Sequence, residues 1–236
     1  MIGVLNAYHF DTTPGCYQEE YLPMMLNYLK IIMPQETIRT YEVAQGVFPK
    51  SVDECKGWII TGSPASAYDD DQWIKDLIEF TQKAHEQNKK ILGICFGHQL
   101  IAHALGGEIE NSNKGWGVGV REFNLQTETP LISKEVATEL NNKCALLFSH
   151  QDQVIKLPPN AVNIAGDDFC PHQIYAIDEH IFSIQGHPEF TVEYAKKRYD
   201  ARIEKLGEKV HAQAIKSLTD NIHHLEIGKC IKSFFS

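Results

Sequence analysis

The sequence lacks the features that mark several large protein classes. No apolar run approaches the roughly 18 residues needed to span a bilayer. The start of the chain has no positively charged region followed by an apolar stretch, so we expect no signal peptide. These absences predict a soluble, cytoplasmic protein with no membrane partner.

Metal-binding and disulfide patterns are missing as well. The cysteines are widely scattered and form no C-x-x-C pair, which argues against a structural zinc site. Scattered cysteines in a chain without a secretory signal are expected to be reduced thiols. They stand at Cys16, Cys55, Cys95, Cys144, Cys170 and Cys230.

Basic clusters are also absent. Lys and Arg number 22 against 31 Asp and Glu, which gives a net charge of −9 at pH 7. Nucleic-acid binding requires many Lys and Arg to neutralise phosphates, so nucleic acid is not an expected partner. The sequence also holds no G-x-x-x-x-G-K-[ST] nucleotide loop.

What is present is an alternation of apolar runs and helical periods. Strands are predicted at 2–8, 37–43, 57–61 and 91–94, and helices at 17–32, 72–87 and 99–105. This order predicts an α/β fold of three layers, with an open, mostly parallel sheet flanked by helices. Residues 108–186 carry short strand-like runs that predict an antiparallel extension. With no repeat or linker, we interpret 1–236 as a single domain with a core at 1–195 and a C-terminal helical tail at 196–236.

The most informative motif is Gly93-Ile94-Cys95-Phe96-Gly97, which has the form G-x-nucleophile-x-G. In that motif the nucleophile lies on a sharp turn between a strand and a helix. Both glycines are expected because a Cβ at either position would clash with the neighbouring strand or helix. The helix start favours a thiolate at Cys95 and offers the Phe96 N–H as an oxyanion donor. The alternative interpretation is a buried cysteine in a glycine-rich turn.

A cysteine nucleophile needs a base, and the base needs an orienting group. The segment His187-Pro188-Glu189 follows a predicted strand at 181–185. Residues two apart in an extended chain point the same way, so Glu189 can hold one ring nitrogen of His187 while the other faces the thiol. This predicts Cys95, His187 and Glu189 as a catalytic triad. A surface loop with a chance His and Glu is the alternative, and His98 is expected to have a structural role.

Three segments together resemble the class I (triad-type) glutamine amidotransferases: G-I-C-F-G-H-Q-L around Cys95, S-H-Q-D-Q-V at 149–154 and Q-G-H-P-E-F at 185–190. The likeness is greatest to stand-alone proteins similar to the amidotransferase domain of GMP synthase, and it covers about residues 1–195. It implies a flavodoxin-like fold with an antiparallel extension. It also implies hydrolysis of the glutamine side-chain amide through a γ-glutamyl thioester, with release of ammonia and without a metal or organic cofactor.

The same resemblance assigns roles to further residues. The turn at 62–64 is similar to the family's G-G-P segment, with serine in place of the second glycine, and its Ser63 N–H would complete the oxyanion hole with Phe96. Substrate binding is implied for Gln99, Gly115, Trp116 and His150. Asp152 matches the family's H-x-D-x-V element near the pocket.

The ligand implied is glutamine or another γ-glutamyl small molecule, with a separate ammonia-accepting synthetase as the partner. A second hypothesis is a stand-alone γ-glutamyl peptidase that uses the same triad on compounds such as glutathione conjugates. A third is a protein without catalytic activity, because related folds carry an elbow cysteine in redox sensors and chaperones.

Overall fold

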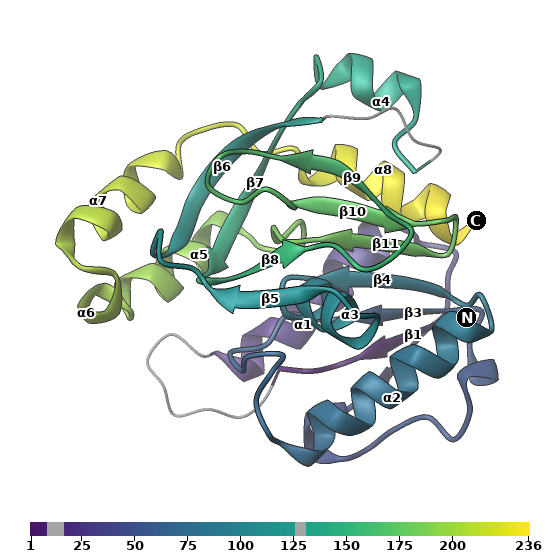
Figure 1. The fold of residues 1–236 in the computed structure, drawn as a ribbon. Coiled ribbons are helices and arrows are strands. Elements are labelled where there is room, and N and C mark those ends of the chain that lie inside the picture. The colour runs from purple at the N-terminus through teal and green to yellow at the C-terminus, as the bar shows by residue number, and fades with distance from the viewer. Residues whose placement is uncertain (9–16, 126–130) are drawn as a thin grey trace.

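The computed structural model describes residues 1–8, 17–125 and 131–236 (Figure 1). Cys16 lies outside these ranges, and the other five cysteines are buried free thiols. None of the helices within the described ranges is long and apolar enough to cross a membrane.

The described residues form a sheet of nine strands that runs through the molecule (Figure 1). Five neighbouring strands are parallel, in the order β2 (Ile38–Tyr41), β1 (Ile2–Leu5), β3 (Gly57–Ile60), β4 (Lys90–Ile94) and β11 (Ile181–Ile184). The sheet continues antiparallel through β10 (Ile174–Ile177), β9 (Ala161–Gly166), β6 (Gly117–Leu125) and β7 (Lys143–His150). The predicted parallel sheet with an antiparallel extension is confirmed.

Helices cover both faces of the parallel strands. One face carries α1 (Gln18–Ile32) and α8 (His224–Phe235), whose apolar side chains form a cluster with Val4 and Ile59. The other face carries α2 (Gln72–Glu86) and α3 (Phe96–Ala104), which pack with Leu5 and Ile60. Successive side chains of β1 and β3 thus point to opposite faces, as the pleat of a strand requires. The result is the predicted three-layer α/β fold.

The C-terminal residues pack onto this core. Helix α8 buries an apolar stripe with spacings of three and four residues, made of Ile227, Cys230, Ile231, Phe234 and Phe235. Between β11 and α8 lie α5 (Val192–Asp200), α6 (Ile203–Leu206) and α7 (Glu208–Ser217). In Figure 1, α6 and α7 project to the left of the sheet, while α8 lies behind it.

The antiparallel strands curl until the outer edge of β7 meets the chain that leaves β11. The N–H of His187 donates to the carbonyl of Leu147 at 2.8 Å. Two residues earlier on the same edge, the Ala145 carbonyl accepts from the His223 N–H at 2.8 Å, and the Ala145 N–H donates to His223 Nδ1 at 3.0 Å. The loop that carries His187 is therefore attached to the far end of the sheet.

Two parts of the fold were not expected from the sequence. A separate antiparallel pair joins β5 (Glu108–Asn111) to β8 (Asp152–Lys156). A short helix, α4 (Lys134–Glu139), lies within the stretch that predicted only strands, and the Ser133 hydroxyl caps it by accepting from the Val136 N–H. Strand β5 is mostly exposed and polar, so it lacks the apolar pattern that predicts a strand.

Candidate active site

Cys95 lies at the sharp turn between β4 and α3. Its backbone has φ +51° and ψ −99°, in a region that residues with a side chain rarely occupy. Among the described residues, the other non-glycine residues with positive φ are all Asn or Asp, which tolerate that region best. Hydrogen bonds from the Cys95 N–H to the Ile184 carbonyl and from the Gln99 N–H to the Cys95 carbonyl hold the turn in this strained form.

Both glycines of the motif are required by close packing. A Cβ on Gly93 would lie 2.6 Å from Ile101 Cδ1 and 2.7 Å from the Gly97 carbonyl oxygen. A Cβ on Gly97 would lie 2.3 Å from the Ile60 carbonyl oxygen, in the adjacent strand β3. These distances are far below van der Waals contact, so helix α3 can approach β3 and β4 only because neither residue has a side chain.

His187 and Glu189 lie on the loop that follows β11. The Nδ1 atom of His187 is 2.7 Å from Glu189 Oε1, and the two side chains are 4% and 0% exposed. The ring of Phe190 stacks on the imidazole, with centroids 3.8 Å apart and planes at 11°. Ring stacking, the carboxylate and the backbone bond to β7 therefore fix the orientation of the imidazole.

These groups converge beside the turn at Gly62, which follows β3. A Cβ placed on Gly62 would lie 3.0 Å from His187 Cε1 and 3.8 Å from Cys95 Cβ. The imidazole and the cysteine side chain are thus brought together at the carboxyl ends of three parallel strands, β3, β4 and β11. This is the edge at which ligands bind in open α/β sheets.

Burial and charge act in opposite directions on His187. Burial disfavours the imidazolium, but the charge of Glu189 and the charge and hydrogen bond of Cys95 outweigh it, so the pKa of His187 rises to about 9. The imidazole is therefore in its doubly protonated, positively charged form at neutral pH. Because Nδ1 is bonded to Glu189, Nε2 is the nitrogen that interacts with Cys95.

Two backbone N–H groups are available near the thiol. The Phe96 N–H begins α3 and has no hydrogen-bond partner within the described part of the chain, as expected for a helix start. Ser63 lies in the turn after β3 and lines the same cavity as Cys95. The Ser63 hydroxyl accepts from the Ala65 N–H at 3.2 Å, which steadies this turn.

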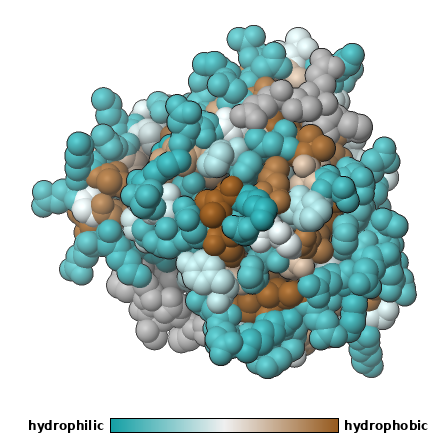
Figure 2. All heavy atoms as spheres, viewed as in Figure 1, coloured by the Kyte–Doolittle hydropathy of each residue, from teal (hydrophilic) through white to brown (hydrophobic). Residues whose placement is uncertain are grey.

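A cavity of about 140 Å³ opens onto Cys95. Its walls come from the turn after β3, the start of α3, the β5–β8 pair, the end of β7 and the segment around α5. The lining consists of Ser63, Pro64, Ala65, Ser66, Cys95, Gln99, Asn111, Trp116, Ser149, His150, Gln151, Asp152, Arg198 and Arg202. Most of these side chains are polar, which suits a polar ligand. Figure 2 shows a mostly hydrophilic face of the molecule with hydrophobic patches toward its centre.

Three of the residues predicted to bind substrate line this cavity, namely Gln99, Trp116 and His150. Gly115 does not line it, although it has φ +83° next to Trp116. Gln99 Nε2 donates to the Asp152 carbonyl at 2.7 Å and to Gln185 Oε1 at 3.1 Å, so its amide group is fixed in direction.

His150 and His98 are buried neutral histidines. Burial lowers the pKa of each to about 3, and for His150 the charge of His187 adds to the effect. Neither is a base that competes with His187 at neutral pH. Ser183 Oγ lies 2.8 Å from His98 Nδ1, and this contact links α3 to β11 near the turn at Cys95.

Asp152 connects three segments around the cavity. Its carboxylate accepts hydrogen bonds from the Ser66 hydroxyl, the Tyr68 hydroxyl and the Asn111 amide. The loop after β3 is thereby tied to strands β5 and β8. No cluster of three or more potential metal ligands occurs among the described residues.

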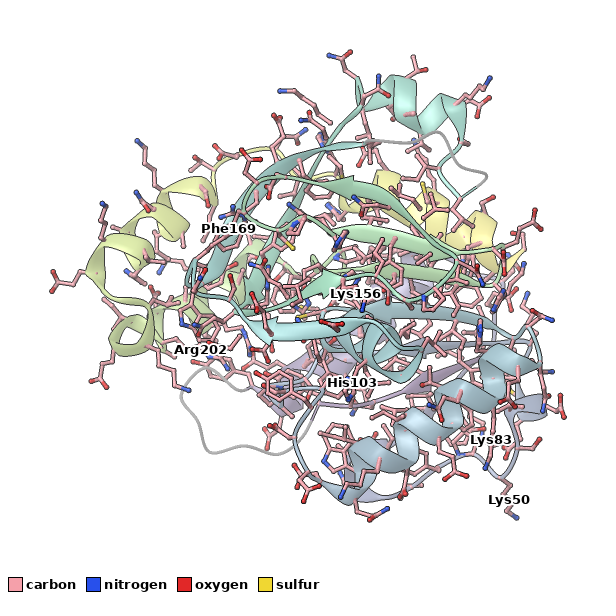
Figure 3. All side chains as sticks on the ribbon, viewed as in Figure 1. Lys50, Lys83, His103, Lys156, Phe169 and Arg202 are labelled. Atoms are coloured by element: carbon pink, nitrogen blue, oxygen red, sulfur yellow. The ribbon has the colours of Figure 1, made fainter. Side chains whose placement is uncertain are left out.

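Arg198 and Arg202 line the cavity although no motif pointed to them. They are 4% and 6% exposed and belong to the segment predicted as a helical tail. Arg198 Nε donates to Ser149 Oγ at 2.9 Å, and Nη1 donates to Tyr8 Oη at 2.7 Å. Figure 3 labels Arg202 beside α6 and close to the end of β5. Nothing in their spacing distinguishes them from other helical arginines, because the cavity they line is formed by residues distant in sequence.

Comparisons with known proteins place the chain in a family. The family model of the class-I glutamine amidotransferases matches residues 27–203. A γ-glutamyl peptidase 3 from Arabidopsis thaliana is 35% identical over 75% of this chain and 73% of that protein. A glutamine-hydrolysing GMP synthase from Fusobacterium nucleatum is 33% identical over 58% of this chain, but only 25% of that protein is covered. The crystal structure of a glutamine amidotransferase from Thermotoga maritima shares the fold, with a TM-score of 0.75 at 15% identity over 99% of this chain and 96% of that one.

Proposed function

The chain belongs to the class I glutamine amidotransferase family, and from this premise we propose that it hydrolyses a γ-glutamyl amide bond with Cys95 as the nucleophile. One observation supports the proposal above all. Cys95, at a strained elbow, and His187, hydrogen-bonded to Glu189, converge on one point beside Gly62, and the cavity opens onto Cys95. Glutamine is the simplest substrate of this class.

The proposed reaction has two steps. Cys95 Sγ attacks the γ-carbonyl carbon, the C–N bond breaks, and His187 gives its proton to the departing amine, which leaves a γ-glutamyl thioester. Water then attacks the thioester carbon and passes a proton to His187, the C–S bond breaks, and Cys95 is regenerated as the γ-carboxyl product is released. Glu189 keeps the imidazole in the orientation and protonation state that both steps need.

Charge on the carbonyl oxygen is stabilised in this proposal by two backbone donors. The Phe96 N–H at the start of α3 is one, and the Ser63 N–H in the turn after β3 is the other. Donors fixed in position before the reaction stabilise a tetrahedral oxyanion without reorganisation.

The cavity walls supply groups for the remainder of the substrate. Gln99, Trp116 and His150 would contact the α-amino-acid end, and Gly115 would support the Trp116 segment. Arg198 and Arg202 add two buried cations to the wall of the cavity that opens onto Cys95, in a chain of net charge −9, which favours a ligand that carries a carboxylate. These arginines also join residues 196–236 to the site, in support of the single-domain interpretation.

A γ-glutamyl peptide is the second candidate substrate. The relative from Arabidopsis thaliana carries the name γ-glutamyl peptidase, and the arginines of the cavity suit a second carboxylate on the leaving amine. The glutamine hypothesis differs because it calls for a separate synthetase that accepts ammonia. Measuring kcat/KM for glutamine and for γ-glutamyl peptides with and without a free carboxylate distinguishes the two.

The nucleophile is tested by labelling with a diazo-ketone analogue of glutamine, followed by intact mass and peptide mapping. We expect one label per chain, located at Cys95, and no label or turnover in Cys95→Ala. Cys55→Ala is the matched control, because Cys55 is another buried thiol, 3% exposed and outside the cavity. Retention of most activity by Cys95→Ala on both substrate types would show that the nucleophile is assigned wrongly.

A further inference from the structure

Tyr21 is buried next to the proposed triad but has no role in the reaction described above. It lies in the first turn of α1, and its side chain is fully buried. The Gly62 N–H donates to Tyr21 Oη at 3.0 Å, and Oη donates to Glu189 Oε1 at 3.1 Å. One hydroxyl therefore joins the turn after β3 to the carboxylate on the loop after β11.

The direction of these hydrogen bonds is fixed by their chemistry. A backbone N–H can only donate, so the Tyr21 oxygen accepts from Gly62 and its single proton goes to Glu189. Glu189 Oε1 thus receives two donors, the Tyr21 hydroxyl and His187 Nδ1. The other oxygen, Oε2, is buried without a hydrogen-bond partner among the described residues. Loss of the hydroxyl would leave His187 as the one donor to this buried carboxylate within the described ranges.

Aromatic packing holds the hydroxyl in place. The Tyr21 ring stacks on Tyr8, with centroids 4.4 Å apart, and meets Phe190 edge-on at 6.4 Å. Phe190 in turn stacks on His187. Burial and then the charge of Glu189 raise the pKa of Tyr21 well above its ordinary value, so the hydroxyl keeps its proton and remains a donor at neutral pH.

We propose that Tyr21 is a positioning residue that couples the oxyanion turn at Gly62 to the carboxylate of Glu189. The inference rests on the proposed function, in which the Ser63 N–H, next to Gly62, binds the oxyanion and Glu189 orients His187. The Ser63 N–H and the His187 imidazole then keep a fixed relative position, because the Tyr21 hydroxyl is hydrogen-bonded both to Gly62, next to Ser63, and to Glu189, which holds His187. Tyr21 touches no reacting atom and does not line the cavity.

Tyr21→Phe removes the hydroxyl and keeps the ring. The matched control is Tyr28→Phe, two turns further along α1, where a 5% exposed tyrosine donates to the His224 carbonyl at 2.8 Å. Each variant loses one buried hydroxyl from the same helix, so a general loss of stability affects both. Thermal unfolding of the two variants measures this shared loss of stability.

The kinetic result expected for Tyr21→Phe is a fall in kcat of about 10-fold or more, because a hydrogen bond to a buried charged group is lost. KM is expected to change little, since the hydroxyl lies outside the cavity. Tyr28→Phe is expected to keep the wild-type kcat. Equal kcat values in the two variants, or a Tyr21→Phe effect confined to KM, would overturn the proposal.

Two further measurements need no substrate. The ring of His187, followed by NMR in histidine-labelled protein, is expected to titrate at higher pH in Tyr21→Phe, because Glu189 has one donor fewer and attracts the imidazolium more strongly. Amide exchange at residues 61–66 is expected to accelerate, because the Gly62 N–H loses its acceptor. Tyr28→Phe is expected to leave both unchanged.

A His187 midpoint in Tyr21→Phe that stays in place or falls would refute the coupling, as would equal changes in Tyr28→Phe. These results are independent of the proposed function. If wild-type protein hydrolyses no γ-glutamyl amide, the function fails while the titration and exchange still decide whether Tyr21 joins the two segments.

Discussion

Glu189→Gln removes one negative charge from the pair with His187 and keeps the size of the side chain. The charges of Glu189 and Cys95 overcome burial and raise the pKa of His187 from its ordinary 6.5 to about 9. One pKa unit corresponds to about 1.4 kcal/mol, so the folded protein holds this proton more tightly than the unfolded chain by roughly 3 kcal/mol. Without the carboxylate charge, only Cys95 opposes the effect of burial, so the pKa of His187 should fall.

The sign of the pH dependence follows from the raised pKa. Below pH 6.5 His187 is protonated in both the folded and the unfolded protein, and its contribution to the free energy of unfolding is at its full value. It declines as pH rises from 6.5 toward 9 and is absent above that range. The difference in unfolding free energy between wild type and Glu189→Gln should therefore be largest in mild acid and should shrink toward alkaline pH.

Urea unfolding at about pH 6 and about pH 10 measures this difference, which should fall by up to roughly 3 kcal/mol between the two conditions. Glu193→Gln is the matched control, because it removes an exposed carboxylate four residues along the chain. Its stability relative to wild type should not depend on pH. A Glu189→Gln difference that is the same at both pH values would refute the assignment of the charge pair.

Two other predictions test the candidate site more simply. His187→Ala should reduce kcat/KM for glutamine more than Glu189→Ala, because the carboxylate acts on the reaction only through the base. Steady-state kinetics on both variants would contradict this ranking if the Glu189→Ala loss were equal or larger. Gly97→Ala would place a Cβ 2.3 Å from the Ile60 carbonyl oxygen and should lower stability by about 1–3 kcal/mol; an unchanged Tm would show that α3 and β3 can separate without cost.

Local patterns in the sequence were sufficient for much of the fold. The parallel strands other than β2 are short, mostly apolar runs, and helices such as α2 bury residues at helical spacing, here Ile74, Leu77 and Phe80. Such signals depend on the burial of each element alone. Strand β5 gave no such signal because its backbone pairs with β8 while three of its four side chains face solvent.

Some residues of the candidate site could also be predicted from local sequence patterns, and others could not. Cys95, His187 and Glu189 could be proposed because each stands in a short motif whose residues also interact with one another in space. Tyr21 and Arg202 could not, since their importance lies in contacts with segments more than 40 positions away. A tyrosine in an amphipathic helix is ordinarily a core residue, and only the positions of Gly62 and Glu189 distinguish this one.

The curled antiparallel strands affect how copies of this protein behave toward one another. An outermost strand normally offers free backbone N–H and C=O groups, which can recruit a strand from another molecule and start fibrous aggregation. Here the outward groups of Ala145 and the carbonyl of Leu147 are already bonded, to His223 and to His187. The hydrogen bonds that attach the His187 loop to β7 thus also leave fewer free backbone groups on this strand for pairing with another copy of the chain.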